Sequence, residues 1–372
     1  MKFTGSRVGF GDPAAGRVDP IGASHMPAVA AHRRWAERIA SVRVASRAGE
    51  WWEDKLAPIL GTGYATAAFA GAPLIDSAGE LALVLVALVP GAVYVSLLND
   101  LTDRDVDRLA GKWNRIDGRS PRAWWAGVAA CLGAALAISA IAWRDDPWTL
   151  LFYGAAWVAF ALYSVPPVRL KARGAFGVLA DAAGAQLFPH LLMVAAVLAA
   201  AGRQLDASLV AAVGCWAFAS GVRGALWHQL SDRAADVSAG LRTFGSTRPD
   251  LARRLGAYVV FPLELIAFVA LLVLASGVLA ALLMPAYAWL EYRRTRRWGA
   301  RIVVVTPAEP YRIAMQEYYV AIFPLAFLVS TTLEQPGAAL VLAAHLLLFH
   351  QTPVRIAADA YDEVRDYLPW TR

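Results

Sequence analysis

Charged residues and cysteines are scarce in this chain. Asp, Glu, Lys and Arg make up 17% of its 372 residues, against about a quarter in soluble domains, so an ordinary soluble enzyme is excluded. Disorder is excluded as well, because 58% of the residues are hydrophobic. The two cysteines, Cys131 and Cys215, stand inside apolar runs and provide neither a disulfide framework nor a CxxC metal site.

Apolar runs long enough to cross a bilayer fill most of the chain. A span needs about 20 apolar residues, and the runs predict an all-α polytopic membrane protein with nine or ten transmembrane helices. Arginine is concentrated in alternate loops, so the positive-inside rule places both termini and those loops in the cytoplasm. The net charge of +6 then favours membrane lipid over nucleic acid as a partner. The long runs lie near 56–75, 81–98, 124–143, 148–165, 176–201, 207–227 and 257–276, and the shorter ones near 278–290, 318–333 and 338–349.

Composition divides the chain into three parts. Residues 1–50 contain no apolar run of the kind that signal peptides carry. We expect a flexible tail there, followed by an amphipathic helix that lies on the bilayer surface or packs on the protein's own cytosolic face. Residues 51–290 hold the transmembrane core, and residues 291–372 form an extension with one or two further spans.

One short segment occurs twice. Residues 101–111 read LTDRDVDRLAG and residues 230–240 read LSDRAADVSAG, at a constant offset of 129 positions. Each copy follows an even-numbered predicted span, so both copies are expected on the cytosolic side. Membrane folds often place functional sites at corresponding positions of internal repeats. The duplication therefore marks both segments as candidate functional sites.

Aspartates recur at helical spacing within each copy. Asp103 and Asp107 stand four residues apart, as do Asp232 and Asp236, so each pair shares one face of a helix. Like charges at this spacing destabilise a helix, and carboxylates beside a membrane are costly without a cationic partner. Nearby arginines are one such partner. The duplication favours divalent cations instead, and oxygen ligands of this kind favour Mg²⁺.

The aspartate segments resemble those of a known family. The stretch NDLTDRDVD at 99–107 is similar to the NDxxDxxxD motif of the UbiA superfamily of intramembrane prenyltransferases, and DRAADVSAG at 232–240 looks like its DxxxDxxxG motif. Between them, YSVPPVRLK at 163–171 resembles a further segment of several members. The resemblance covers roughly residues 52–290 and implies helices around a central cavity. It also implies that Mg²⁺ and a prenyl diphosphate are held by Asn99, Asp100, Asp103, Asp107, Asp232 and Asp236.

The implied reaction transfers a prenyl group from its diphosphate to an acceptor, and a leaving diphosphate needs cations around it. Tyr163 is a candidate for facing an allylic cation, and His228 stands where the repeat places Asn99. We therefore predict Asp103, Asp232, Tyr163 and His228 as catalytic residues. The basic residues beyond the motifs are candidate diphosphate contacts, or else ordinary topology-determining charges: Lys112, Arg115, Arg169, Lys171 and Arg242.

The sequence departs from the family's pattern in ways that leave the acceptor open. The stretch GKWNRIDGR at 111–119 replaces a His-Pro-x-Lys-Arg-x-Arg-Pro segment of some branches. A membrane terpene cyclase and a phosphoribosyl-type transfer to a lipid phosphate are therefore alternatives. A cation-coupled transporter is disfavoured, because the acids stand at span ends rather than at the midplane. Within the spans, Asp181 is expected to pair with Arg223 or else to activate an acceptor.

Overall fold

The computed structural model describes residues 48–109, 111, 113–118, 120–299, 301–306 and 311–365. They belong to one compact unit, Ala45–Arg372. The other unit, Met1–Val44, lies outside the described residues, and with it nearly all of the predicted tail and amphipathic helix. The described part is helical, as predicted, apart from a short parallel pair of strands, β1 (Arg301–Val303) and β2 (Tyr311–Ile313). The predicted boundaries at residues 50 and 290 stay predictions.

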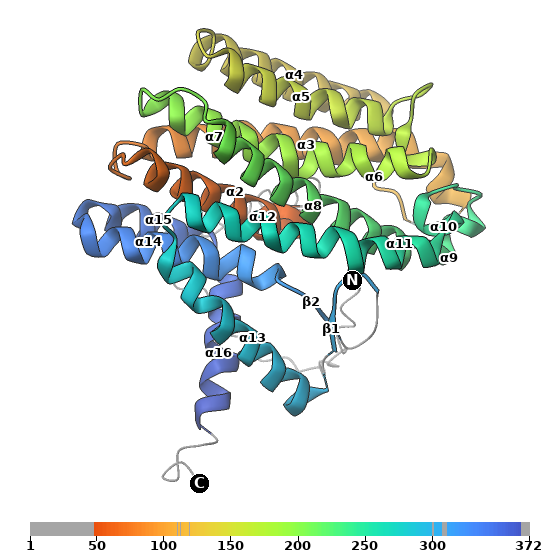
Figure 1. Ribbon diagram of the computed structural model, residues 1–372. Helices are drawn as coiled ribbons and strands as arrows, with labels where there is room; N and C mark the ends of the chain where they lie inside the picture. The colour runs from red at the N-terminus through yellow and green to blue at the C-terminus, as the bar shows by residue number, and fades with distance from the viewer. Residues whose placement is uncertain are drawn as a thin grey trace, which may run out of the picture. The chain divides into compact units, whose positions relative to one another are not determined.

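The helices of the bundle run alongside one another in Figure 1. The first part of the chain forms α2 (Ala48–Ala70), α3 (Ala78–Leu109), α4 (Pro121–Ala142), α5 (Pro147–Ser164), α6 (Ala175–Ala182) and α7 (Phe188–Ala200). The second part forms α8 (Ala207–Ser231), α9 (Arg233–Ser238), α10 (Phe244–Thr247), α11 (Pro249–Leu255), α12 (Phe261–Leu274), α13 (Val278–Trp298), α14 (Phe323–Glu334), α15 (Ala339–Leu348) and α16 (Gln351–Arg365).

Local sequence determines where the helices begin. Pro147 occupies the first turn of α5, where its fixed φ suits a helix and its missing N–H is not needed. The carboxylate of Asp146 accepts a hydrogen bond from the Thr149 amide at 3.1 Å. Asp206 caps α8 in the same way, accepting from the amides of Ser208 and Leu209 at 2.9 and 3.0 Å. Each cap satisfies backbone donors that the first turn leaves without partners.

Five described helices, with α6–α7 and α11–α12 each counted as one, are long and apolar enough to cross a bilayer. A sixth results if Pro336–Leu348 and α16, which meet at 87°, are counted together. Helices α2, α5 and α13 have 23, 18 and 21 residues but are not among these. The count of nine or ten spans is therefore not confirmed and stays a prediction.

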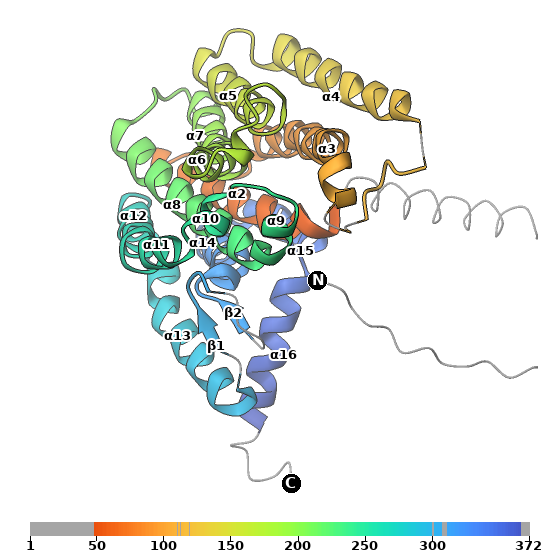
Figure 2. The ribbon, with the colours of Figure 1, turned by 90° about the vertical axis from the view of Figure 1, so that its right-hand side faces the viewer.

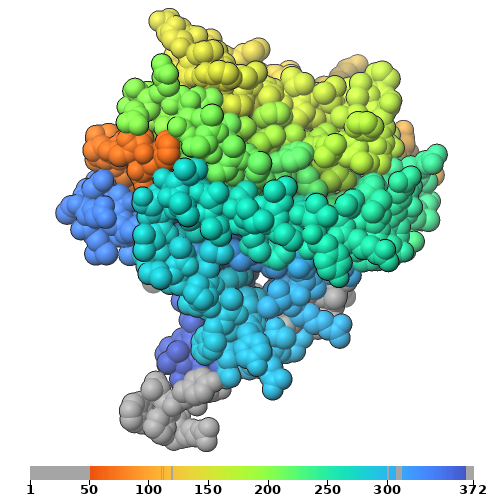
Figure 3. All heavy atoms as spheres, viewed as in Figure 1, coloured from red at the N-terminus to blue at the C-terminus, as the bar shows by residue number. Residues whose placement is uncertain are grey.

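The main core lies among α2, α7, α8, α12 and α14. Its centre is Trp216, whose ring centroid lies 5.1, 5.3 and 5.5 Å from those of Phe268, Tyr319 and Phe323. Helix α4 packs chiefly against α3 and keeps most of its surface exposed, as expected of a lipid-facing helix. The space-filling view shows α12 and α13 covering one face below α4 and α5 (Figure 3).

Candidate active site

The two aspartate segments lie at the same end of the bundle. The first forms the last turns of α3, and the second surrounds α9. Both views of the ribbon place the end of α3 and α9 at this end, which faces the reader in Figure 2. Tyr163, near the end of α5, lies within electrostatic range of Asp103, Asp232 and Asp236. The fold therefore brings the two repeat copies to the same end of the bundle.

Asp103 faces two cations from the loop between α5 and α6. Its Oδ1 lies 2.6 Å from Lys171 Nζ and 2.9 Å from Arg169 Nη2. Arg169 adopts a φ of 37°, a conformation that costs a non-glycine residue about 1–3 kcal/mol. Burial lowers the pKa of Lys171, and the nearby Asp103 carboxylate opposes that shift. Two of the predicted diphosphate contacts thus stand directly at a predicted metal ligand.

Asp100 and Asp107 hold the loop that follows α3. The buried Asp100 carboxylate accepts from Arg115 Nε at 2.6 Å. Asn114 donates to Asp107 Oδ2 at 2.8 Å and to the Asp100 carbonyl at 3.0 Å. Arg115 also donates to the Ser96 carbonyl at 3.1 Å. Sequence reasoning missed Asn114, whose role depends on the loop folding back onto α3.

In the second segment, Asp236 is held by the residue that caps the following helix, α10. Asp232 is exposed between α8 and α9, whereas Asp236 is buried and accepts from Thr243 Oγ1 at 3.0 Å. Thr243 Oγ1 in turn accepts from the Ser246 amide at 3.1 Å, which caps α10. Thr243 was not predicted, since a single threonine seven residues beyond an aspartate carries no recognisable pattern.

A cavity of about 310 Å³ lies beside the first segment. Asn99 lines it, and the Asn99 Oδ1 accepts from Ser164 Oγ at 2.5 Å. His228, at the equivalent position of the repeat, lines the same cavity. Its remaining polar lining includes Lys55 and Asp181, and its walls include Trp51, Ile59, Leu88, Tyr94, Tyr153, Trp157 and Phe160. The cavity therefore has polar groups next to the aspartates and a mainly apolar, aromatic lining elsewhere.

The predicted pairing of Asp181 with Arg223 is wrong. Arg223 donates from Nε and Nη2 to Glu264 at 2.6 and 2.7 Å, in a bidentate pair buried between α8 and α12. Asp181 lines the cavity instead, together with Lys55 and His228. Sequence spacing alone could not show that the Arg223 side chain faces α12.

Lys112 and Arg242 are two further predicted diphosphate contacts. Lys112 lies outside the described residues. Arg242 is exposed, lines a surface pocket together with Arg173 and Arg248, and accepts from the Gly174 amide through its carbonyl at 3.2 Å. It does not line the cavity beside Asn99.

The donor set fits a hard cation. Carboxylate and amide oxygens are the ligands that Mg²⁺ takes, usually together with substrate phosphates, and Asn99, Asp103, Asp107, Asp232 and Asp236 supply them. Within the described ranges, no three His, Cys, Asp or Glu side chains already form a metal site.

Comparisons with known proteins identify the fold and the family. The fold is similar to that of a UbiA homolog from Archaeoglobus fulgidus, which is 20% identical in sequence. The similarity covers 76% of this chain and 96% of the homolog. The TM-score is 0.51 for the homolog structure bound to GPP and Mg²⁺ and 0.50 for the one bound to DMAPP and Mg²⁺. No curated protein sequence matches the chain. The model of the UbiA prenyltransferase family matches residues 59–303. The chain thus belongs to the UbiA prenyltransferase family.

Proposed function

We propose that this protein is a Mg²⁺-dependent intramembrane enzyme that transfers a prenyl group from a prenyl diphosphate to an acceptor. The observation that carries the proposal is the cavity beside Asn99, which joins an apolar, aromatic lining to the end of the bundle where both aspartate segments lie. The ligands of the archaeal homolog, GPP or DMAPP with Mg²⁺, support the same substrate class.

In this proposal the diphosphate lies between the two segments and the prenyl chain lies in the cavity. Asn99, Asp103, Asp107, Asp232 and Asp236 would hold the metal. Mg²⁺, when bound, neutralises the charge that develops on the leaving diphosphate. Lys171 and Arg169 contribute further positive charge beside Asp103. Arg115, a predicted diphosphate contact, is instead paired with the buried Asp100, a predicted metal ligand.

The carbon–oxygen bond to the diphosphate breaks, and the diphosphate leaves with the electron pair. A nucleophilic atom of the acceptor then forms the new bond to that carbon and gives up its proton. Tyr163 is the aromatic residue that we assign to the developing cation. It is not among the residues that line the cavity, but Lys171 Nζ lies 5.8 Å from its ring centroid. His228 and Asp181 line the cavity where an acceptor would lose its proton.

The arginine distribution supports a multi-pass location in the cell membrane, with the aspartate segments on the cytoplasmic side. An acceptor would then enter from the cytoplasm or the inner leaflet. In this proposal the acceptor binds near His228 and Asp181, which line the cavity.

A turnover assay without added acceptor tests the reaction class. Purified protein in detergent receives radiolabelled geranyl, farnesyl, geranylgeranyl or longer polyprenyl diphosphate, with Mg²⁺ or with EDTA. We expect tight binding that EDTA abolishes, with little product. A Mg²⁺-dependent cyclic hydrocarbon or alcohol would instead indicate a terpene cyclase. Absence of binding for every prenyl diphosphate would contradict the proposed donor and return phosphoribosyl-type transfer to consideration.

Replacing Lys171 with alanine is expected to weaken Mg²⁺-dependent binding of geranyl diphosphate by about 10- to 100-fold. A hydrogen bond to a charged group contributes about 1.5–3 kcal/mol, which corresponds to that range of dissociation constants. Calorimetric titration measures the effect. Arg173→Ala is the matched control, because Arg173 is exposed and donates to the Pro167 carbonyl at 2.9 Å. Equal affinity of Lys171→Ala and wild type would make Lys171 an ordinary topology-determining charge.

A further inference from the structure

Helix α16 turns polar residues toward the protein and apolar residues outward. Val354, Tyr361 and Val364 are 62%, 65% and 53% exposed, and with the exposed Ala357 and Ala358 they recur at the three- and four-residue intervals of one helix face. We call this face the α16 stripe. On the other side of the helix, Thr352 and Glu363 are buried. A helix on the surface of a soluble domain shows the opposite arrangement.

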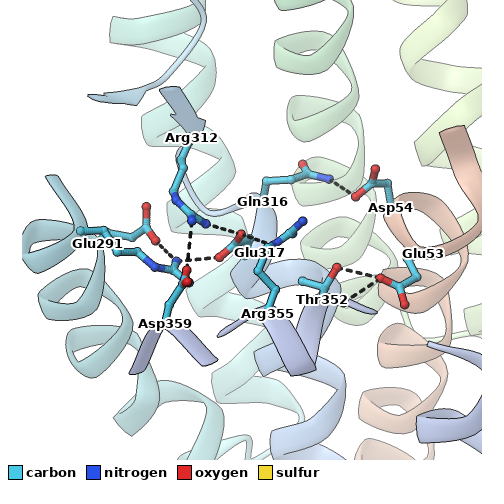
Figure 4. Close-up of polar contacts among 10 residues, drawn as sticks. Glu53, Asp54, Glu291, Arg312, Gln316, Glu317, Thr352, Arg355 and Asp359 are labelled. Carbon is cyan, nitrogen blue, oxygen red and sulfur yellow. Dashed lines mark hydrogen bonds and ion pairs between the residues drawn. The ribbon is translucent and has the colours of Figure 1, made fainter. Parts of the chain in front are cut away.

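Ion pairs hold the polar face of α16 against the protein (Figure 4). Asp359 Oδ2 lies 2.6 Å from Arg294 Nη2 on α13 and 3.0 Å from Arg312 Nη2 on β2. Glu363 Oε1 lies 2.5 Å from Arg293 Nη2, also on α13. Arg294 is buried among these partners. The pairs fix the rotation of α16 about its own axis, so the outward position of the α16 stripe follows from the polar contacts.

The start of α16 is fixed to α2. Glu53 accepts from the amides of Gln351 and Thr352 at 2.7 and 2.9 Å, which caps the helix. Trp52 donates from its indole to the Leu348 carbonyl at 2.9 Å, where α15 ends. The neighbouring Trp51 and Lys55 line the cavity beside Asn99. The beginning of α16 therefore lies at the level of the substrate cavity, toward the end of the bundle that carries the aspartates.

The bend before α16 fixes its direction relative to the bundle. Helix α15 packs on α14, which packs on α2, and all three run along the bundle axis in Figure 1. The axes on the two sides of the bend differ by 87°. Because spanning helices follow the membrane normal with modest tilt, α16 runs nearly parallel to the membrane plane.

From this geometry we propose that α16 lies in the interfacial layer of the leaflet nearer the aspartate segments, with the α16 stripe inserted among the lipids. We assign the contact of the α16 stripe to the bilayer because α15, directly before the bend, already exposes Leu340 and Leu347, at 71% and 80%. The α16 stripe continues that lipid-facing surface in a helix parallel to the membrane. In-plane helices bury their apolar faces roughly 5–10 Å into the headgroup and acyl boundary.

Site-directed spin labelling tests this placement in the full chain. Cys131→Ala and Cys215→Ala first remove the native thiols. Nitroxide labels are then attached singly at Val354→Cys, Tyr361→Cys and Val364→Cys, and the protein is placed in nanodiscs of phosphatidylcholine and phosphatidylglycerol. Collision rates with oxygen, which concentrates in lipid, and with a water-soluble nickel chelate are measured. Leu340→Cys serves as the lipid reference and Asp105→Cys, whose native side chain is 91% exposed, as the water reference.

The three α16 labels are expected to collide more with oxygen than with nickel, as at Leu340→Cys and opposite to Asp105→Cys. Nickel collision rates as high as at Asp105→Cys would place the α16 stripe in water and overturn the proposal. Low rates with both reagents, together with dipolar broadening between labels, would assign the α16 stripe to contact with a second copy and overturn it as well. The readout does not depend on catalysis, so it is independent of the proposed function.

Discussion

Replacing Asp103 or Asp232 with alanine is expected to reduce turnover of a prenyl diphosphate by at least about 10³-fold. Each change removes a carboxylate from one repeat copy, and with it the cation that stabilises the leaving diphosphate. Because the proposed function has the two copies hold the same diphosphate, we expect losses of similar size from the two variants. Release of diphosphate, measured with membrane lipid extract supplied as the acceptor pool, reports turnover, and Mg²⁺-dependent binding of geranyl diphosphate to the purified protein reports binding separately.

Two controls separate chemistry from folding. Asp105→Ala removes an exposed carboxylate from the same helix, and we expect nearly wild-type turnover. Asp103→Ala leaves the buried Lys171 without its carboxylate partner. Asp103→Asn removes the negative charge but keeps an oxygen that can accept a hydrogen bond from Lys171. Both Asp103 variants are expected to be inactive with an unchanged elution profile in detergent. Wild-type turnover in either alanine variant would contradict the metal-site assignment.

The placement of the site could be predicted because it depends on periodicity and order along the chain. An exact offset between the repeats implies equivalent positions, and Asn99 and His228 do line one cavity. The position of the two aspartate segments after corresponding spans likewise explains why both lie at the same end of the bundle. These relations need only helix geometry and chain topology.

Other relations depend on packing between distant segments. Nothing in the local sequence distinguishes Glu264 from Asp181 as the partner of Arg223, since either could be reached from a neighbouring helix. The close approach of α6 and α8 depends on Gly221, where an added Cβ would lie 2.8 Å from Ala182 Cα. The C-terminal run near 338–349 is apolar, yet α15 has only 10 residues before the bend. Hydropathy alone does not reveal that α16 leaves the bundle axis.

The buried pair of Arg223 and Glu264 gives the largest expected effect on stability. Their side chains are 3% and 0% exposed, and Arg223 also donates to the Val304 carbonyl at 3.3 Å. Arg223→Met leaves the Glu264 carboxylate buried without its cation, a change that costs about 3–5 kcal/mol in comparable pairs. We expect a marked fall in the thermal unfolding midpoint in detergent, followed by tryptophan fluorescence, and a matching loss in a denaturant titration.

The double variant Arg223→Met/Glu264→Leu tests whether the loss of stability in Arg223→Met comes from an unpaired buried charge. Apolar residues of similar volume in place of a buried ion pair are often neutral or stabilising, so the double variant should recover most of the stability that Arg223→Met loses. Glu264→Leu alone should be destabilised, because the guanidinium then keeps only the Val304 carbonyl as a partner from this set. If the double variant is as unstable as Arg223→Met, the pair acts through packing between α8 and α12 rather than through charge compensation.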